Sequence, residues 1–179
     1  MRRTSLRFVR VVARPGRRTQ GWLFAGRKMV ALPVALGRAG IKVTKREGDG
    51  GTPAGRFHPI RVWWRADRLP RPVTALPLRR IGPDDAWCED PGDRRYNHAF
   101  RRSANEPGDR LRRADGLYDI VIELDHNTRP RIAGLGSAVF VHVARPAFAP
   151  TAGCIALRRR DILALLRVIS SKTRIIIHS

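Results

Sequence analysis

The sequence predicts a mainly β domain, either a sandwich or a partly open barrel, with one or two helices and a long loop-rich insertion. Three observations indicate this fold. Short runs rich in β-branched and aromatic residues recur along the chain and are separated by Gly, Pro and Arg turns. Convincing helical spacing of apolar residues occurs once, near the C-terminus. The stretch 66–116 is dense in Pro, Gly, Asp and Arg and has little periodicity.

The first part of the chain is expected to supply short strands. Residues 6–13 alternate in part and are expected to form an edge strand; 21–24 and 28–36 follow as strands, and 57–64 resumes strand character. The glycine-rich residues 44–56 between them predict a long loop. That loop lacks the Gly-Lys-Ser/Thr ending of a phosphate-binding loop, so we do not expect a nucleotide site.

The second part of the chain opens with the irregular stretch 66–116, which is unusually long for a connection in a compact domain and therefore indicates a functional segment. We interpret it as an insertion that covers or borders the active site. Residues 118–124 alternate clearly and predict a strand, and the apolar run 138–143 predicts another. Residues 161–169 predict the helix, and 172–177 predict a buried closing strand.

Length and charge bound the class of protein. The 179 residues suit a single domain, 1–179, with its core at about 7–178. Lys and Arg number 36 against 15 Asp and Glu, a formal net charge of +21. Two interpretations stay open: a basic surface that attracts nucleic acid or an anionic envelope polymer, and a drift toward solvated arginines. The arginines are scattered rather than gathered in a tail, so no specific nucleic-acid partner is expected.

Export and membrane signals are weak. Residues 1–14 begin basic, but arginines interrupt every apolar run, so no secretory apolar segment is visible. No stretch approaches the length of a membrane span. The export route, a cytoplasmic role and the oligomeric state are all left open by these features.

The strongest chemical signal is a histidine and a cysteine twelve residues apart. His142 lies near the end of an apolar run, and Cys154 follows in a Pro-Thr-Ala-Gly turn. A thiolate is a strong nucleophile, and an imidazole within hydrogen-bond reach can take the thiol proton. A strand followed by a loop of this length can bring the two side chains together. On spacing alone, a buried cysteine beside a core histidine is the alternative.

The two cysteines do not predict a metal site. Neither Cys88 nor Cys154 has the Cys or His spacing of metal ligands, and we expect neither a metal nor a cofactor. A disulfide between them is conceivable, but it would disable the nucleophile. Cys88 is interpreted as a structural or site-wall residue.

Several segments in the right order resemble one family. Residues 136–143 followed by 149–157 resemble the active-site segment of the L,D-transpeptidase catalytic domain (YkuD-type), in which a histidine precedes a Ser/Thr-x-Gly-Cys turn. Residues 35–41 followed by 45–57 are similar to the family segment that carries a Thr-Pro-x-Gly turn. Residues 87–91 with 95–97, and 117–121, also look like a branch of the family found in Gram-negative bacteria. Together they cover most of the chain, and the fold implied is the β-sandwich or partly open barrel expected above.

The resemblance implies roles for particular residues. Cys154 matches the nucleophile, His142 the general base, and Gly153 with Cys154 the turn whose backbone N–H groups face the developing oxyanion. The chain departs from the commonest pattern at Ala152 and Ala156, where polar residues are frequent. These departures leave open which groups hold the substrate and which group orients the histidine; a backbone carbonyl is one candidate.

The resemblance also implies a reaction and a location. It implies transfer between peptidoglycan stem peptides through a thioester, by cross-linking or D-amino-acid exchange, with sensitivity to carbapenems and work in the periplasm or cell envelope. The alternatives are an L,D-carboxypeptidase or endopeptidase and a non-enzymatic basic module. The residues expected to contact the substrate are Trp87, Tyr96, Asn97, Ser137 and Thr151. For the two aromatics, anchoring of the insertion to the core is the competing role.

Overall fold

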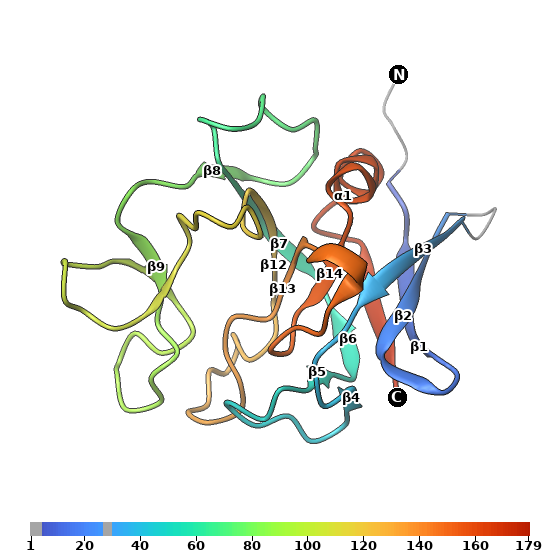
Figure 1. Cartoon of the computed structure of the whole chain (residues 1–179), viewed down its shortest axis with the longest axis horizontal. Helices are drawn as coiled ribbons and strands as arrows, with labels where there is room; N and C mark the ends of the chain where they lie inside the picture. The colour runs from blue at the N-terminus through green and yellow to red at the C-terminus, as the bar shows by residue number, and fades with distance from the viewer. Residues whose placement is uncertain (1–4, 27–29) are drawn as a thin grey trace.

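In the described residues, 5–26 and 30–179 of this computed structural model, the main element is a ten-stranded mixed sheet. Residues 28 and 29 of the predicted strand 28–36 lie outside them. The strands are β1 (Phe8–Arg14), β2 (Arg17–Ala25), β3 (Val30–Ala35), β6 (Gly55–Phe57), β7 (Pro59–Trp64), β8 (Leu78–Arg80), β12 (Ile120–Leu124), β13 (Phe140–Val143), β14 (Ile155–Leu157) and β15 (Arg174–His178). Their spatial order is β6-β15-β1-β2-β3-β14-β13-β12-β7-β8 (Figure 1).

The sheet curls back on itself. Strand β6 is at one end and β7 is next to last at the other, yet only His58 separates them in the chain. The two ends must therefore approach each other, and the sheet wraps around a core. In the described residues no ladder joins β6 to β7 or β8, so the barrel is not closed. The prediction of a mainly β, sandwich-like fold is confirmed.

Several predicted element bounds were wrong. Strand β1 was predicted at an edge, but β15 pairs with it in parallel, with Phe8 opposite Arg174. The local sequence pattern of β1 carries no information about a partner strand at the other end of the chain. The predicted strand 57–64 is divided at His58. The helix α1 (Arg159–Leu166) begins earlier and ends earlier than predicted, with Asp161 in its first turn.

The insertion is more ordered than the sequence predicted. Besides β8 it holds a three-stranded sheet of β10 (Ala99–Arg101), β9 (Asp85–Trp87) and β11 (Asp109–Arg110), in green and yellow in Figure 1. Strands of two or three residues are too short for alternation to reveal them. The remaining short elements are β4 (Ile41–Lys42), β5 (Thr52–Pro53) and the 3₁₀ turn η1 (Pro146–Phe148). No helix among the described residues is long and apolar enough to span a bilayer.

Two apolar clusters share β12, whose residues are all buried. Ile120 and Ile122 face the larger cluster inside the curled sheet, which α1 covers with Ile162, Leu165 and Leu166. Val121 faces a second cluster between the outer face of the sheet and the insertion. That second cluster consists of Trp63, Ile81, Trp87, Leu111, Leu117, Tyr118, Val121, Ala138, Phe140 and Cys154. The predicted nucleophile therefore belongs to the packing between sheet and insertion.

Candidate active site

The register of two parallel strands brings the predicted nucleophile and base to one face. In the β13–β14 ladder, His142 lies opposite Ala156. Side chains two residues apart on a strand share a face, so Cys154, two residues before Ala156, points to the side of His142. The packing agrees: Val141, Ile155 and Leu157 belong to the inner cluster, whereas Cys154 belongs to the outer one.

Both side chains line a pocket of about 370 Å³ between the sheet, the glycine-rich loop and the insertion. The loop contributes Lys45, Glu47 and Gly48 to its wall, and the insertion contributes Glu89, Asp109 and Arg113. The volume is within the usual range for small-ligand sites. The insertion thus borders this pocket.

A backbone carbonyl orients the His142 ring. Its Nδ1 lies 2.9 Å from the Val143 carbonyl oxygen. A carbonyl can only accept, so Nδ1 carries the proton and Nε2 is left unprotonated. Burial lowers the pKa of His142 to about 4, although the Val143 carbonyl opposes the shift. The ring is therefore a neutral base at physiological pH, with its lone pair on Nε2.

The Cys154 thiol is also neutral. Its Sγ–H donates to the Ala138 carbonyl at 3.1 Å, and in the described residues no hydrogen bond joins it to His142. Burial raises the pKa of the Cys154 thiol to about 12, and the carboxylates of Asp109 and Glu89 add to this, while Lys45 opposes it. A rotation of the thiol toward Nε2 is needed before the proton can move, which is common in ligand-free sites.

Two threonine hydroxyls fix residues 151–154, the turn that holds the predicted nucleophile Cys154 and is here called the nucleophile turn. Thr151 Oγ1 donates to the Cys154 carbonyl at 2.7 Å and accepts the Gly153 N–H at 3.1 Å. Thr52 Oγ1 approaches the same carbonyl at 3.4 Å and accepts the Gly37 N–H at 2.8 Å. Thr52 belongs to the Thr-Pro-x-Gly segment noted in the sequence, so that segment contacts the backbone of the turn at Cys154.

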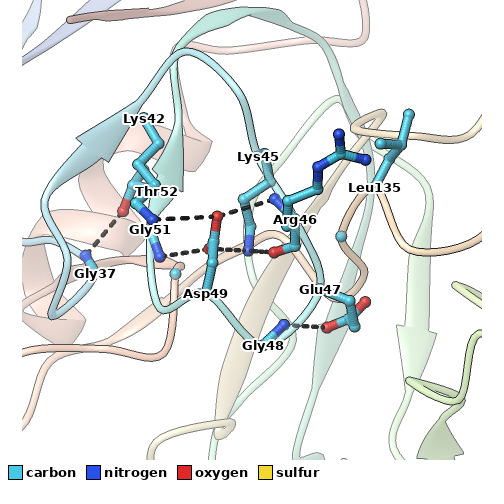
Figure 2. Close-up of polar contacts among 12 residues, drawn as sticks. Gly37, Lys42, Lys45, Arg46, Glu47, Gly48, Asp49, Gly51, Thr52 and Leu135 are labelled. Carbon is cyan, nitrogen blue, oxygen red and sulfur yellow. Dashed lines mark hydrogen bonds and ion pairs between the residues drawn. The ribbon is translucent and has the colours of Figure 1, made fainter.

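Asp49 organises the glycine-rich loop (Figure 2). Its carboxylate accepts from the Lys45 ammonium at 2.6 Å, from the Gly51 N–H at 2.8 Å and from the Arg46 N–H at 2.9 Å. Burial alone would raise the pKa of Asp49, but these donors lower it to about 2. Lys42 reaches the same carboxylate from a more exposed position, at 3.7 Å. The loop is thus held in one shape against the nucleophile turn.

Tyr118, which sequence reasoning did not single out, also lines the pocket. The Tyr118 ring packs edge-on against His142, with centroids 5.4 Å apart, and its hydroxyl donates to Asp109 at 2.7 Å. The Arg113 guanidinium contacts Asp109 at 3.3 Å and lies over the Tyr118 ring. The Leu-Tyr-Asp-Ile-Val segment was noted for its resemblance, but no spacing rule connects Tyr118 to the distant Asp109.

Three of the residues expected to contact the substrate are buried inside the insertion. Asn97 accepts from Trp87 Nε1 and from the Ala138 N–H through Oδ1, and its amide donates to the carbonyls of His126 and Asn127. The Tyr96 hydroxyl donates to Glu47. None of Trp87, Tyr96 and Asn97 lines the pocket. Their position favours the competing role, in which they tie the insertion to the active-site strand.

Ser137 and Thr151 do line the pocket. The Thr151 hydroxyl is occupied on both sides by the nucleophile turn. The buried Ser137 Oγ has no hydrogen-bond partner among the described residues. Of the five predicted contacts, Ser137 therefore has the hydroxyl best placed to serve a ligand.

Cys88 and Cys154 are both free and buried, so no disulfide joins them. The Cys88 side chain lines a neighbouring pocket of about 360 Å³, which shares Glu89 and Asp109 with the pocket of Cys154, and Cys88 does not line the latter. Within the described ranges, no group of three or more His, Cys, Asp or Glu is arranged to hold a metal ion.

Comparison with known proteins gives one match. The family model of the L,D-transpeptidase catalytic domain (YkuD) matches residues 9–177, nearly the whole chain. No curated protein and no solved structure gives a significant match.

The hydrogen bonds of Asn97 predict a large stability effect. Asn97→Leu keeps the size of the side chain but leaves two N–H groups and two carbonyls unpaired in a buried place. We expect the free energy of unfolding to fall by at least about 4 kcal/mol, since four groups lose their partners and each unpaired group costs about 1–3 kcal/mol. Chemical denaturation measures it.

The matched control is Asn105→Leu, at an exposed position of the same insertion. It should change the free energy of unfolding by no more than about 0.5 kcal/mol. Equal effects of the two substitutions would contradict the clamping role of Asn97.

The nucleophile turn should not tolerate a side chain at position 153. Gly153 has φ +145°, and a Cβ there would lie 2.8 Å from the Gly51 carbonyl oxygen. We expect Gly153→Ala to lower the free energy of unfolding by about 2 kcal/mol more than Gly134→Ala. Gly134 also has positive φ, +78°, but its Cβ would meet nothing within 4 Å. Thermal denaturation of both variants separates the close approach from backbone strain alone.

Proposed function

The chain belongs to the L,D-transpeptidase catalytic domain family, and from that premise we propose that it is a cysteine-dependent L,D-transpeptidase acting on peptidoglycan stem peptides. The family is one of enzymes that act on peptidoglycan. The observation that carries the proposal is the β13–β14 register, because it puts an unprotonated imidazole nitrogen and a thiol on one face of a pocket. Together they form a nucleophile and its base.

In the first half-reaction, His142 Nε2 takes the Cys154 proton as sulfur attacks the carbonyl carbon of the third stem residue, a diamino acid, at its L-centre. The S–C bond forms and the carbonyl π pair moves to oxygen. When that pair returns, the C–N bond breaks, and the amine of the terminal D-alanine leaves with the proton held by His142. The product is a thioester on Cys154.

In the second half-reaction, an amine of a second stem, or a D-amino acid, attacks the thioester carbonyl. His142 takes a proton from the attacking amine, and the Cys154 sulfur leaves and recovers a proton. A cross-link or an exchanged stem results. Water in place of the amine gives a carboxypeptidase or endopeptidase from the same intermediate.

The charges around the pocket suit such a substrate. Stem peptides carry several carboxylates, and the cationic residues that line the pocket, Arg38, Lys45, Arg113 and Arg145, outnumber its acidic residues Glu47, Glu89 and Asp109. The formal charge of +21 adds a general attraction for anionic envelope polymers. This substrate assigns the protein's work to the cell envelope.

Removal of the thiol should abolish the reaction. We expect the wild-type protein to gain the mass of one carbapenem molecule, and to exchange the terminal D-alanine of purified muropeptides for an added D-amino acid. Cys154→Ala should do neither, because no thioester can form. Intact-mass spectrometry and chromatography of the muropeptides measure the two outcomes.

Cys88→Ala is the matched control, since it removes the other buried thiol and should retain both reactions. A carbapenem adduct that persists on Cys154→Ala would exclude this nucleophile. Products that show hydrolysis alone, even with excess D-amino acid, would replace the transferase by the carboxypeptidase alternative.

The low pKa of His142 predicts an unusual pH profile. The base form is the reactive one, and a pKa of about 4 keeps it populated in acid, where an ordinary histidine would protonate near pH 6.5. We expect the rate constant for acylation by a carbapenem to hold its neutral-pH value down to about pH 5 and to fall below it. Stopped-flow measurements across pH test this.

His142→Ala should slow acylation at neutral pH by about 100-fold or more and recover part of the rate in alkali, where hydroxide replaces the base. His98→Ala, at an exposed histidine, is the control and should keep the wild-type rate. An unchanged neutral-pH rate in His142→Ala would remove this residue from the mechanism.

A further inference from the structure

The nucleophile turn offers fewer free donors than the family resemblance implied. Gly153 and Cys154 were expected to direct two backbone N–H groups at the developing oxyanion. The Gly153 N–H instead donates to Thr151 Oγ1 at 3.1 Å. Among the described residues, the Cys154 N–H has no partner. One of the two expected donors is therefore already used, and the oxyanion needs another.

A buried ammonium lies against this turn. The Lys45 side chain is only 7% exposed and lines the pocket. Its Cε is 3.8 Å from the position that a Cβ would take on Gly153, and 3.2 Å from the corresponding position on Gly136. These two glycines allow the lysine stem to run alongside the turn toward the site. The ammonium is also close enough to lower the pKa of the Cys154 thiol against the dominant effect of burial.

The ammonium has one donor to spare. Nζ donates to Asp49 Oδ1 and to the Arg46 carbonyl, both at 2.6 Å (Figure 2). An ammonium has three N–H donors, so one is left over. The two fixed contacts also restrict where the ammonium can move, which preorganises the third N–H.

The ion pair with Asp49 does not by itself require a buried lysine. Asp49 also accepts from the Gly51 and Arg46 N–H groups, and Lys42 approaches it with a side chain that is 39% exposed. Burying an ammonium costs desolvation that a structural ion pair often fails to recover. The burial of the Lys45 ammonium at this pocket is better explained by the negative charge that develops on the substrate oxygen during the proposed acyl transfer.

We propose that Lys45 is a catalytic residue that supplies the second oxyanion donor beside the Cys154 N–H. As the S–C bond forms and the carbonyl π pair moves to oxygen, the free N–H of Lys45 donates to that oxygen and keeps its proton. The hydrogen bond weakens when the pair returns and the C–N bond breaks. This role rests on the proposed acyl transfer.

The test compares two reactions of the same thiol. Acylation by a carbapenem passes through an oxyanion, whereas alkylation by iodoacetamide displaces iodide from a saturated carbon and forms none. We expect Lys45→Met to slow acylation by about 100-fold, the usual effect of losing one oxyanion donor, and to slow alkylation far less. Lys42→Met removes the same charge near the same carboxylate and should leave both rates unchanged.

Two further variants guard against a disturbed loop. Lys45→Arg keeps the charge and a donor and should recover part of the acylation rate. Lys45→Met with Asp49→Asn removes the carboxylate that would be left without its ammonium, and should stay folded, as thermal denaturation reports, while acylating as slowly as Lys45→Met.

Three results would overturn the proposal. If Lys45→Met acylates at the wild-type rate, backbone donors stabilise the oxyanion without the lysine. The second donor beside the Cys154 N–H would then be the Ala152 N–H. If acylation and alkylation fall by the same factor, Lys45 acts on the thiol and not on the oxyanion. If Lys42→Met matches Lys45→Met, only net charge matters. A wild-type protein that forms no carbapenem adduct would instead reject the acyl transfer itself.

Discussion

The chemistry of this site depends on the burial of one face of the sheet beneath the insertion. Phe140, His142 and Cys154 point outward from β13 and the start of β14, where an ordinary sandwich would meet water. The insertion covers that face through the second apolar cluster. Loss of water then keeps the thiol and the imidazole neutral, with pKa values of about 12 and 4. In the proposed reaction, a neutral pair transfers its proton as the sulfur attacks, and the groups that stabilise the oxyanion become more important.

The glycine-rich loop connects the fold to that requirement. Asp49 gathers the Lys45 ammonium and two backbone N–H groups, and this fixes the loop against Gly153, one residue before the nucleophile. Thr52, three residues further along, accepts the Gly37 N–H and approaches the Cys154 carbonyl. One loop therefore supports the nucleophile from two directions. Gly153 is needed because a Cβ there would lie 2.8 Å from the Gly51 carbonyl oxygen.

The sequence predicted the parts of the site that depend on local pattern and on family likeness. Cys154 and His142 follow from a short segment whose register could be inferred from a strand, a turn and another strand. Trp87, Tyr96 and Asn97 were expected at the substrate because aromatic and amide residues in a long loop suit binding, but the same residues suit a buried clamp equally well. Their burial, their absence from the pocket wall and hydrogen bonds such as that of Asn97 with the Ala138 N–H favour the clamp. Likewise, the alternation in β1 predicted an edge strand, because the sequence pattern does not reveal that β15, at the far end of the chain, pairs with it.

The arginines have two separate roles, pairing with buried carboxylates and giving the protein a net positive charge, and composition alone does not separate them. Some arginines pair with carboxylates that would otherwise be buried and unpaired: Asp119, at 4% exposure, accepts from both Arg68 and Arg159 and so joins the base of the insertion to α1. At a distance, one arginine cancels the charge of each such carboxylate, so the Asp119 group, with two arginines, keeps a net charge of one. The net charge of +21 comes from the cations that outnumber the carboxylates, 36 against 15. Such an excess of positive charge attracts any polyanion at long range but does not distinguish one from another. Selection then depends on the pocket, where a carboxylate holds Lys45 and another holds Arg113. For the proposed substrate, a small anionic peptide, selection over a long polyanion would therefore depend on the size and fixed charges of the pocket rather than on the overall charge.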